Sequence, residues 1–180
     1  MTEPKRTALY EAHVEAKGKV IDFGGWALPV QYAGIIDETK ATREAAGLFD
    51  VSHMGEIMVE GPEALQFVQR LVTNDVTRIT DYQIQYSPMC YETGGTVDDL
   101  LIYRYSQDKI LLVVNASNTD KDFAWIKSNL QGNVKVENIS NQVSQIALQG
   151  PKAQSILQKL TATDLNTIKY FWFLPEVEIE

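Results

Sequence analysis

Hydrophobic residues recur along the chain with two different periods, and these periods predict a mixture of helices and strands. Between about residues 83 and 115, apolar and polar residues alternate in short runs, as they do on half-buried strands. After Gly61 and Pro62 the spacing changes to three and four residues, which predicts an amphipathic helix with one buried face. The apolar positions of that helix are Leu65, Val68, Leu71 and Val72.

The same criteria predict an antiparallel meander in the centre of the chain. Gly94-Gly95 and residues 106–108 are hairpin signals between three strand-like runs. Strands are expected at 19–23, 85–91, 96–105, 109–114 and 134–137, and helices at 9–17, 35–46, from Pro62 to about Asn74, and 119–130.

Three further local expectations concern glycines and the end of the chain. Gly47 is expected to close the second helix in the left-handed conformation. Residues 48–59 are predicted to be extended chain interrupted by Gly55, and the aromatic run 170–174 is predicted to be strand-prone. Because helices and strands are mixed without a regular βαβ alternation, the predicted class is α+β, with antiparallel sheets and flanking helices.

An internal repeat suggests how the chain is organised. Residues 61–71 and 150–160 are identical at five of eleven positions, and each copy follows a predicted strand. Two unrelated helices that each begin with Gly-Pro are the competing explanation. A duplication predicts a first repeat at about 48–136 and a second at about 137–180. The second repeat is expected to be cut short, which makes residues 1–180 an incomplete domain of a larger protein.

Composition narrows the classes of partner. The chain has 180 residues and a formal net charge of −8, which argues against nucleic-acid or anionic-membrane binding because both need a basic face. Cys90 is the single cysteine, so no intrachain disulfide is possible, and one cysteine with two histidines argues against a zinc site. With no apolar segment of signal-peptide or membrane-spanning type, the expected location is cytoplasmic.

Asp98 and Asp99 follow the Gly-Gly turn and lie on opposite faces of the predicted strand. The period of two places Asp99 with Leu101 on one face and Asp98 with Leu100 on the other. Both faces are apolar further along, so at least one carboxylate is expected at the margin of a buried surface, where it needs a hydrogen bond or a cation. A solvated pair at the end of a hairpin is the ordinary alternative.

Five segments, in order and at similar spacing, resemble the T-protein family, the aminomethyltransferases of the glycine cleavage system. Phe-Gly-Gly-Trp-Ala-Leu-Pro begins the first segment, Phe-Asp-Val-Ser-His-Met-Gly is in the second, and Gly-Gly-Thr-Val-Asp-Asp-Leu forms the third. The resemblance covers essentially the whole chain. The segments are 23–32, 47–55, 94–100, 113–116 and 148–151.

The resemblance implies a folate-binding fold built from two related, interlocked halves. It also implies transfer of a one-carbon unit from the aminomethyl-dihydrolipoyl arm of the H-protein to tetrahydrofolate, with release of ammonia. By the resemblance Asp99 is the essential aspartate beside the folate ring, and Met54, Tyr86 and Asn115 line the folate cavity. Family members also carry a downstream Gly-Tyr-Thr-Gly-Glu segment and arginines that complete the pocket, which this chain lacks.

Each of these residues also has an ordinary structural interpretation. Met54 can be core filler, Tyr86 a half-exposed strand aromatic, and Asn115 a residue at a strand end. His53 is interpreted as structural, because no Ser or Cys nucleophile accompanies it. Alternative functions are a non-catalytic folate-binding protein, an inert fragment, or the folate domain of a dimethylglycine or sarcosine oxidase relative.

Overall fold

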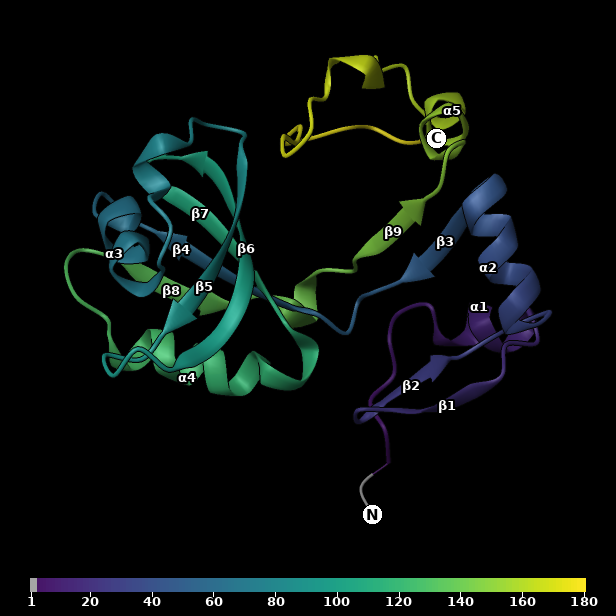
Figure 1. Cartoon of the computed structure of the whole chain (residues 1–180), viewed down its shortest axis with the longest axis horizontal. Helices are drawn as coiled ribbons and strands as arrows, with labels where there is room; N and C mark the ends of the chain where they lie inside the picture. The colour runs from purple at the N-terminus through teal and green to yellow at the C-terminus, as the bar shows by residue number, and fades with distance from the viewer. Residues whose placement is uncertain (1–2) are drawn as a thin grey trace. The chain divides into compact units, whose positions relative to one another are not determined.

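The computed structural model describes residues 3–180, which divide into two compact units. One unit comprises residues 3–53, 144–165 and 178–180, and will be called the N-terminal unit. The other comprises residues 54–143 and 166–177, and will be called the central unit. The predicted α+β class is confirmed, because both units combine antiparallel strands with helices (Figure 1).

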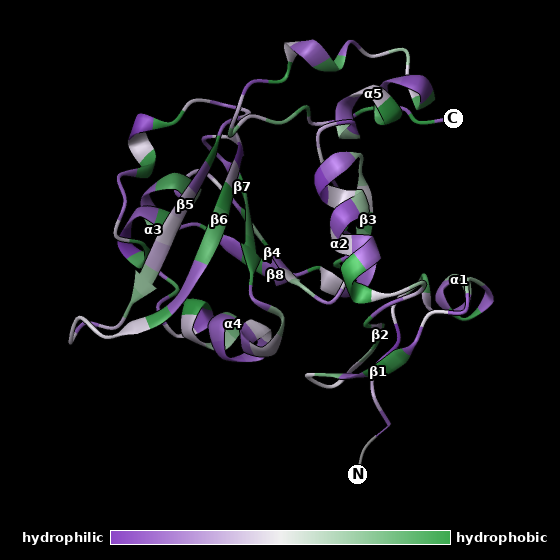
Figure 2. Ribbon diagram, turned by 45° about the vertical axis from the view of Figure 1, so that its right-hand side comes forward, coloured by the Kyte–Doolittle hydropathy of each residue, from purple (hydrophilic) through white to green (hydrophobic). Residues whose placement is uncertain are grey.

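The central unit is built on a five-stranded antiparallel sheet with the strand order β5-β6-β7-β4-β8. The meander β5-β6-β7 is the one predicted from the alternation, and tight turns connect its strands. Figure 2 shows that β7 is almost entirely hydrophobic, as expected for a strand in the middle of a sheet. The strands are β4 (Gly55–Glu60), β5 (Ile84–Cys90), β6 (Thr96–Ser106), β7 (Lys109–Val114) and β8 (Lys135–Asn138).

Two helices, α3 (Ala64–Leu71) and α4 (Thr119–Ser128), pack in one hydrophobic core with this sheet. Phe67 from α3 and Ile126 from α4 are fully buried in that core with Ile57 of β4. Burial of each such side chain stabilises the fold by about 1.5–3 kcal/mol. Short 3-10 turns complete the unit: η1 (Val76–Arg78), η2 (Ala116–Asn118) and η3 (Ser140–Gln142), while η5 (Leu165–Thr167) spans the boundary between the units.

The N-terminal unit contains two small antiparallel sheets and three short helices. β1 pairs with β2 in a hairpin, and β3 pairs with β9, which comes about a hundred residues later in the chain. The elements are α1 (Tyr10–Glu15), β1 (Val20–Phe23), β2 (Trp26–Pro29), α2 (Ile35–Glu44), β3 (Gly47–Asp50), β9 (Ile146–Gln149), α5 (Ala153–Leu157) and η4 (Gln158–Leu160).

The two copies of the sequence repeat have the same local structure. In each, a strand is followed by a glycine with positive φ, 136° at Gly61 and 127° at Gly150, then by proline and a helix. The amide of Ala64 donates to the carbonyl of Gly61, and that of Ala153 to the carbonyl of Gly150, both at 3.0 Å. This likeness favours a duplication, although the repeat boundaries stay a prediction.

Three local expectations were wrong. Gly47 does not close α2 in the left-handed conformation but begins β3, and a Cβ there would lie 2.4 Å from Thr42 Oγ1. Gly55 does not interrupt a strand but begins β4, because the extended chain breaks at 51–54 instead. Residues 170–174 form no strand and pair through a single bridge, Gln83 to Trp172. There Phe173 packs edge-on against Tyr103 and Tyr105, so aromatic packing replaces strand pairing.

Among residues 3–180, the helices are too short or too polar to cross a membrane.

Candidate functional site

The register of the five-stranded sheet places one row of side chains across four strands. Leu101 of β6 pairs with Tyr86 of β5 on one side and with Val113 of β7 on the other. Val113 in turn pairs with Glu56 of β4. Because directly paired residues project from the same face of a sheet, these four side chains share one face.

A second row on that face contains two of the residues predicted to bind folate. Two positions along each strand from the first row lie Asp99 on β6, Asn115 just after β7, and Met54 just before β4. Since side chains two positions apart on a strand point to the same side, Asp99 and Asn115 lie beside the row that contains Tyr86, and Met54 directly precedes β4 at the same edge of the sheet. The sheet therefore brings together four residues that are up to 61 positions apart in the sequence.

Asn115 is the residue that connects the polar groups of this site. Its Nδ2 donates to Asp99 Oδ1 at 3.1 Å, to the Asp99 carbonyl at 3.1 Å and to Asp98 Oδ1 at 3.0 Å. The forked contact holds the Asn115 side chain by its amino group, so its amide oxygen is oriented away from both aspartates. The site thus offers one carboxylate and one amide oxygen at an exposed edge.

Tyr86 extends the site on the neighbouring strand. Its ring is 48% exposed, which leaves a face free for stacking on a planar ligand. A hydrogen bond with Asp99, together with partial burial and the charges of Asp99 and Asp98, raises the pKa of the Tyr86 hydroxyl. Tyr86 is therefore a neutral donor to the Asp99 carboxylate at physiological pH. Met54 is half-buried at the other end of the row.

The expectation that one carboxylate of the pair lies at a buried surface is confirmed for Asp98. Asp98 is 7% exposed on the core side of β6, whereas Asp99 is exposed on the other side. Burial acts to raise the pKa of Asp98, but hydrogen bonds from Asp122, Asn115 and the Asp99 backbone outweigh it and lower the pKa. The two adjacent aspartates are thus separated into a buried structural acid and an exposed one.

Sequence reasoning missed two buried acids of the central unit. Asp122 on α4 is fully buried and packs against Asp98. Glu56 is 2% exposed and belongs to the row that contains Tyr86, and burial raises the pKa of its carboxyl to about 7. The alternation of β4 could have identified Glu56, since it is a charged residue between buried positions of a central strand. Asp122 has no such signal, because one face of α4 carries several charged residues.

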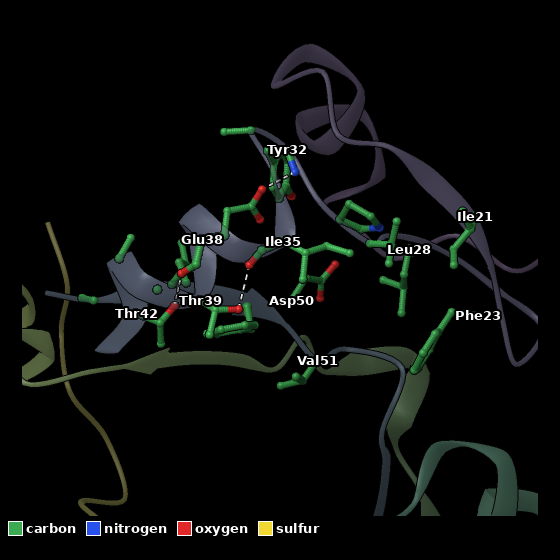
Figure 3. Close-up of a pocket in the computed structure, with 18 of the residues that line it drawn as sticks. Ile21, Phe23, Leu28, Tyr32, Ile35, Glu38, Thr39, Thr42, Asp50 and Val51 are labelled. Atoms are coloured by element: carbon green, nitrogen blue, oxygen red, sulfur yellow. Dashed lines mark hydrogen bonds between the residues drawn. The ribbon is translucent and has the colours of Figure 1, made fainter. Parts of the chain in front are cut away.

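A separate cavity of about 650 Å³ lies within the N-terminal unit and contains none of the predicted site residues. Figure 3 shows the side chains of Ile21, Leu28 and Phe23 at one end and those of Ile35 and Thr39 from α2 at the other. Hydrocarbon groups form most of its wall, and Phe23 and Ile35 are more than half exposed. This cavity and the polar row described above are therefore different features, each within one unit.

Asp50 lies at this cavity in a partly buried hydrogen-bond network. His13 Nε2 is hydrogen-bonded to Asp50 Oδ2 at 2.8 Å, and His13 Nδ1 to Tyr32 Oη at 2.8 Å. Thr7 Oγ1 also donates to Asp50 Oδ2, at 2.6 Å. Burial acts to raise the pKa of Asp50, but hydrogen bonds from Thr7, Ser52 and His13 lower it to about 2. The network ties α1 and the segment that follows β2 to β3.

His53 has no partner of the kind that catalysis by a histidine requires. Its ring is partly buried and packs edge-on against Phe23, with centroids 5.9 Å apart, and burial lowers its pKa. Its Nδ1 has no hydrogen-bond partner among the described residues. Within residues 3–180, acidic, histidine and cysteine side chains also form no group of three placed to hold a metal ion.

Comparison with known proteins identifies a family and several relatives that this chain resembles. Residues 9–179 match the family described as the GCVT N-terminal domain. An aminomethyltransferase of Natranaerobius thermophilus is 58% identical over 180 residues, covering 100% of this chain and 49% of that protein. One of Desulfitobacterium hafniense is 63% identical over 174 residues, covering 96% of this chain and 48% of that protein.

A solved structure shares the fold. The glycine cleavage system aminomethyltransferase T from Bartonella henselae matches with a TM-score of 0.84 and 33% sequence identity, over 93% of this chain and 46% of that one. The chain therefore spans about half the length of the curated relatives it matches.

Proposed function

This chain belongs to the GCVT N-terminal domain family, and on that premise we propose that it acts in the aminomethyltransferase reaction. In this reaction the one-carbon unit passes from the aminomethyl-dihydrolipoyl arm of the H-protein to tetrahydrofolate, and ammonia is released. The observation that carries the proposal is the row of Asn115 and Asp99 beside Tyr86 on one face of the central sheet, with Met54 directly before β4 at the same edge.

The polar groups of this row suit the edge of a folate ring. A pterin presents both hydrogen-bond donors and acceptors, and the row offers the Asp99 carboxylate as acceptor with the Asn115 and Tyr86 side chains around it. The exposed Tyr86 ring and the flexible Met54 thioether supply apolar contacts on either side. Tetrahydrofolate, when bound, supplies the nucleophilic nitrogens that accept the one-carbon unit.

Asp99 is assigned the catalytic role. Its carboxylate is held by Asn115 and Tyr86 before any ligand arrives, so little reorganisation is needed when positive charge develops on the transferred carbon. Electrostatic stabilisation of this kind is commonly a large catalytic contribution, and removal of one such group costs about a hundredfold to a thousandfold in rate. Met54, Tyr86 and Asn115 are assigned to binding.

The partners and location follow from the same proposal. The lipoylated H-protein delivers the substrate, and the reaction takes place in the cytoplasm. The absence of a possible intrachain disulfide, with Cys90 as the single cysteine, supports a reducing compartment.

A titration of the chain with tetrahydrofolate under reducing conditions tests the proposal, with Asp99→Asn as the variant and Asp108→Asn as the control. Asp108 is an exposed aspartate in the turn between β6 and β7, outside the polar row. Saturable binding that Asp99→Asn weakens and Asp108→Asn leaves unchanged is expected. A folded chain that does not bind contradicts the proposal.

Turnover is measured separately, with aminomethylated H-protein and tetrahydrofolate, by the release of ammonia. Ammonia release that falls at least a hundredfold in Asp99→Asn is the expected result. Saturable folate binding without turnover would instead identify a folate-binding chain that does not catalyse the transfer, which was one of the alternatives drawn from the sequence.

A further inference from the structure

Two carboxyl groups meet in the core directly behind the polar row. The carboxyl groups of Asp98 on β6 and Asp122 on α4 interact with each other in the core, and Asp122 has no exposed surface. Apart from the ion pair that Asp122 Oδ1 makes with Lys121, Asp98 Oδ2 and both carboxyl oxygens of Asp122 have no hydrogen-bond partner of good geometry among the described residues. Two ionised carboxylates have no hydrogen to place between them, so the contact requires a proton.

Nearby positive charge does not remove this requirement. Lys121 Nζ lies 3.2 Å from Asp122 Oδ1, but its side chain is 42% exposed, so solvent screens its charge. The same ammonium group also donates to the carbonyl of Val97. One cation shared in this way cannot balance two buried negative charges, and an uncompensated buried charge is costly.

We propose that Asp98 and Asp122 share one proton, with Asp122 as the acid, and that this pair positions Asn115 and Asp99 in the ligand site. The first part concerns the central unit alone, and the second rests on the proposed folate-binding function. Asp122 does not reach the exposed face of the sheet, so it acts through Asp98 and is a positioning residue.

The electrostatics of the pair indicate which member holds the proton. Burial, the hydrogen bond with Asp98 and the charge of Asp98 raise the pKa of Asp122 to about 7. The pKa of Asp98 is lowered, because its hydrogen bonds from Asp122, Asn115 and the Asp99 backbone outweigh the effect of burial. Asp122 is therefore the donor, and Asp98 the acceptor that keeps its negative charge.

The hydrogen bonds of Asp98 connect the buried pair to the ligand site. Asp98 Oδ1 accepts from Asn115 Nδ2 at 3.0 Å, and the same Nδ2 lies 3.1 Å from Asp99 Oδ1. When Asp122 loses its proton, two negative charges face each other in the core and the contact that fixes Asp98 is lost. The Asn115 amide then loses its anchor, and the ligand site loses its preformed geometry.

The charged groups near Asp122, and the other acid with a raised pKa, determine how the shared proton is tested. The core-facing residues of β4 and β8, including Ile57, Val59 and Val136, are apolar, so Asp98 and Lys121 are the charged groups that act on Asp122. Glu56 has a pKa of about 7 as well, but it projects from the opposite face of the sheet. A readout that distinguishes aspartate from glutamate is therefore needed.

The proton is tested by carbon NMR on the chain labelled at the aspartate side-chain carboxyl carbons, between pH 5 and about 9. One aspartate resonance is expected to titrate near pH 7, to disappear in Asp122→Asn and to remain in Asp120→Asn. Asp120 is the matched control, because it is an exposed aspartate in the same helical turn. No aspartate titrating above pH 6 in the wild-type chain would overturn the proposal, whether or not the chain binds folate.

The positioning role is tested by the pH profile of tetrahydrofolate affinity. In the wild type and Asp120→Asn, affinity is expected to fall by up to about tenfold per pH unit above pH 7, because binding then requires uptake of one proton. Asp122→Asn keeps an N–H donor toward Asp98 and does not titrate, so its affinity is expected to match that of the wild type at pH 6 and to stay level above pH 7. Equal profiles in all three proteins would overturn the positioning role, and so would an unfolded Asp122→Asn.

A chain that shows the aspartate titration but binds no folate contradicts the proposed function while leaving the shared proton in place. A chain that binds folate but lacks the titrating aspartate contradicts the shared proton alone. The two failures are therefore distinguishable.

Discussion

Asn115 Nδ2 and Asp99 Oδ1 lie 3.1 Å apart, which joins the end of β7 to β6 at the exposed edge of the central sheet. The pair is preformed, because the same amide nitrogen is also held by the buried Asp98 at 3.0 Å. Polar groups that are already oriented lose little entropy when a ligand binds. This relationship is the reason that the exposed Asp99 has a defined position on an otherwise open strand.

Replacement of Tyr86 by Phe is expected to weaken tetrahydrofolate binding about two- to tenfold. The change removes one hydrogen bond to Asp99, and a typical hydrogen bond contributes about 0.5–1.5 kcal/mol. Stability should change by less than about 0.5 kcal/mol, since the ring is 48% exposed. Calorimetric titration measures the effect, with Tyr170→Phe as control because Tyr170 is 89% exposed. Equal affinities for both variants would remove Tyr86 from the binding site.

Glu56→Gln is expected to abolish the loss of stability that the wild type shows as the pH rises from about 4.5 to about 7. The pKa of the buried Glu56 is raised from 4.5 to about 7. A raised acid pKa means that the folded chain holds the proton more tightly, so the unfolding free energy falls as pH rises from about 4.5 through about 7. The difference corresponds to roughly 3 kcal/mol. The variant should therefore be more stable than the wild type at pH 8 and similar to it at pH 5.

Urea denaturation across this pH range measures the effect of Glu56→Gln. Glu92→Gln is the control, because Glu92 is exposed in the turn after β5. If the unfolding free energy of Glu56→Gln equals that of the wild type at every pH, Glu56 is ionised in the folded chain and is not buried.

Gly55→Ala is expected to destabilise the central unit by about 1–3 kcal/mol, the usual cost of overpacking a core. A Cβ at Gly55 would lie 2.4 Å from Thr119 Oγ1 and 2.7 Å from Val114 Cγ2. The matched change Gly95→Ala has its nearest neighbour at 3.7 Å and should be close to neutral. Thermal unfolding of the two variants compares them directly. Similar melting temperatures would show that the contact between the start of β4 and α4 is looser than described.

Asp50→Asn is expected to destabilise the N-terminal unit by roughly 2 kcal/mol at pH 7. Hydrogen bonds from Thr7, Ser52 and His13 oppose the effect of burial and lower the pKa of Asp50 from 3.8 to about 2. A lowered acid pKa contributes stability above pH 4 that is lost as pH falls through about 2. The difference between variant and wild type should therefore shrink between pH 4 and pH 2. Denaturation at both pH values measures it, with the exposed Asp37→Asn as control.

The sequence alone was enough to predict the central meander and the two faces of β6. Alternation is a local property, since side chains two positions apart on a strand share a face whatever the strand packs against. It therefore separated Asp98 from Asp99 correctly, and the structure confirms that Asp98 is the buried one. The resemblance of five segments identified the family that residues 9–179 match.

Local signals were less informative where distant segments determine the conformation. Gly47 looks like a helix terminator, but its role is to leave space for Thr42 and the Phe49 ring as β3 begins. Residues 170–174 are strand-prone by composition, yet Phe173 is held by three tyrosine rings of the central unit. Packing partners that are far away in the sequence outweigh intrinsic propensity in both cases.

The fold class, the meander and the candidate residues Met54, Tyr86, Asp99 and Asn115 could be named from the sequence. Only the tertiary structure decided that they form two adjacent rows, because the register between strands joins positions up to 61 residues apart. It also decided that Asp122 meets Asp98 in the core. A helix carrying charged residues gives no sign of which one will be buried, since burial depends on the sheet that the helix packs against.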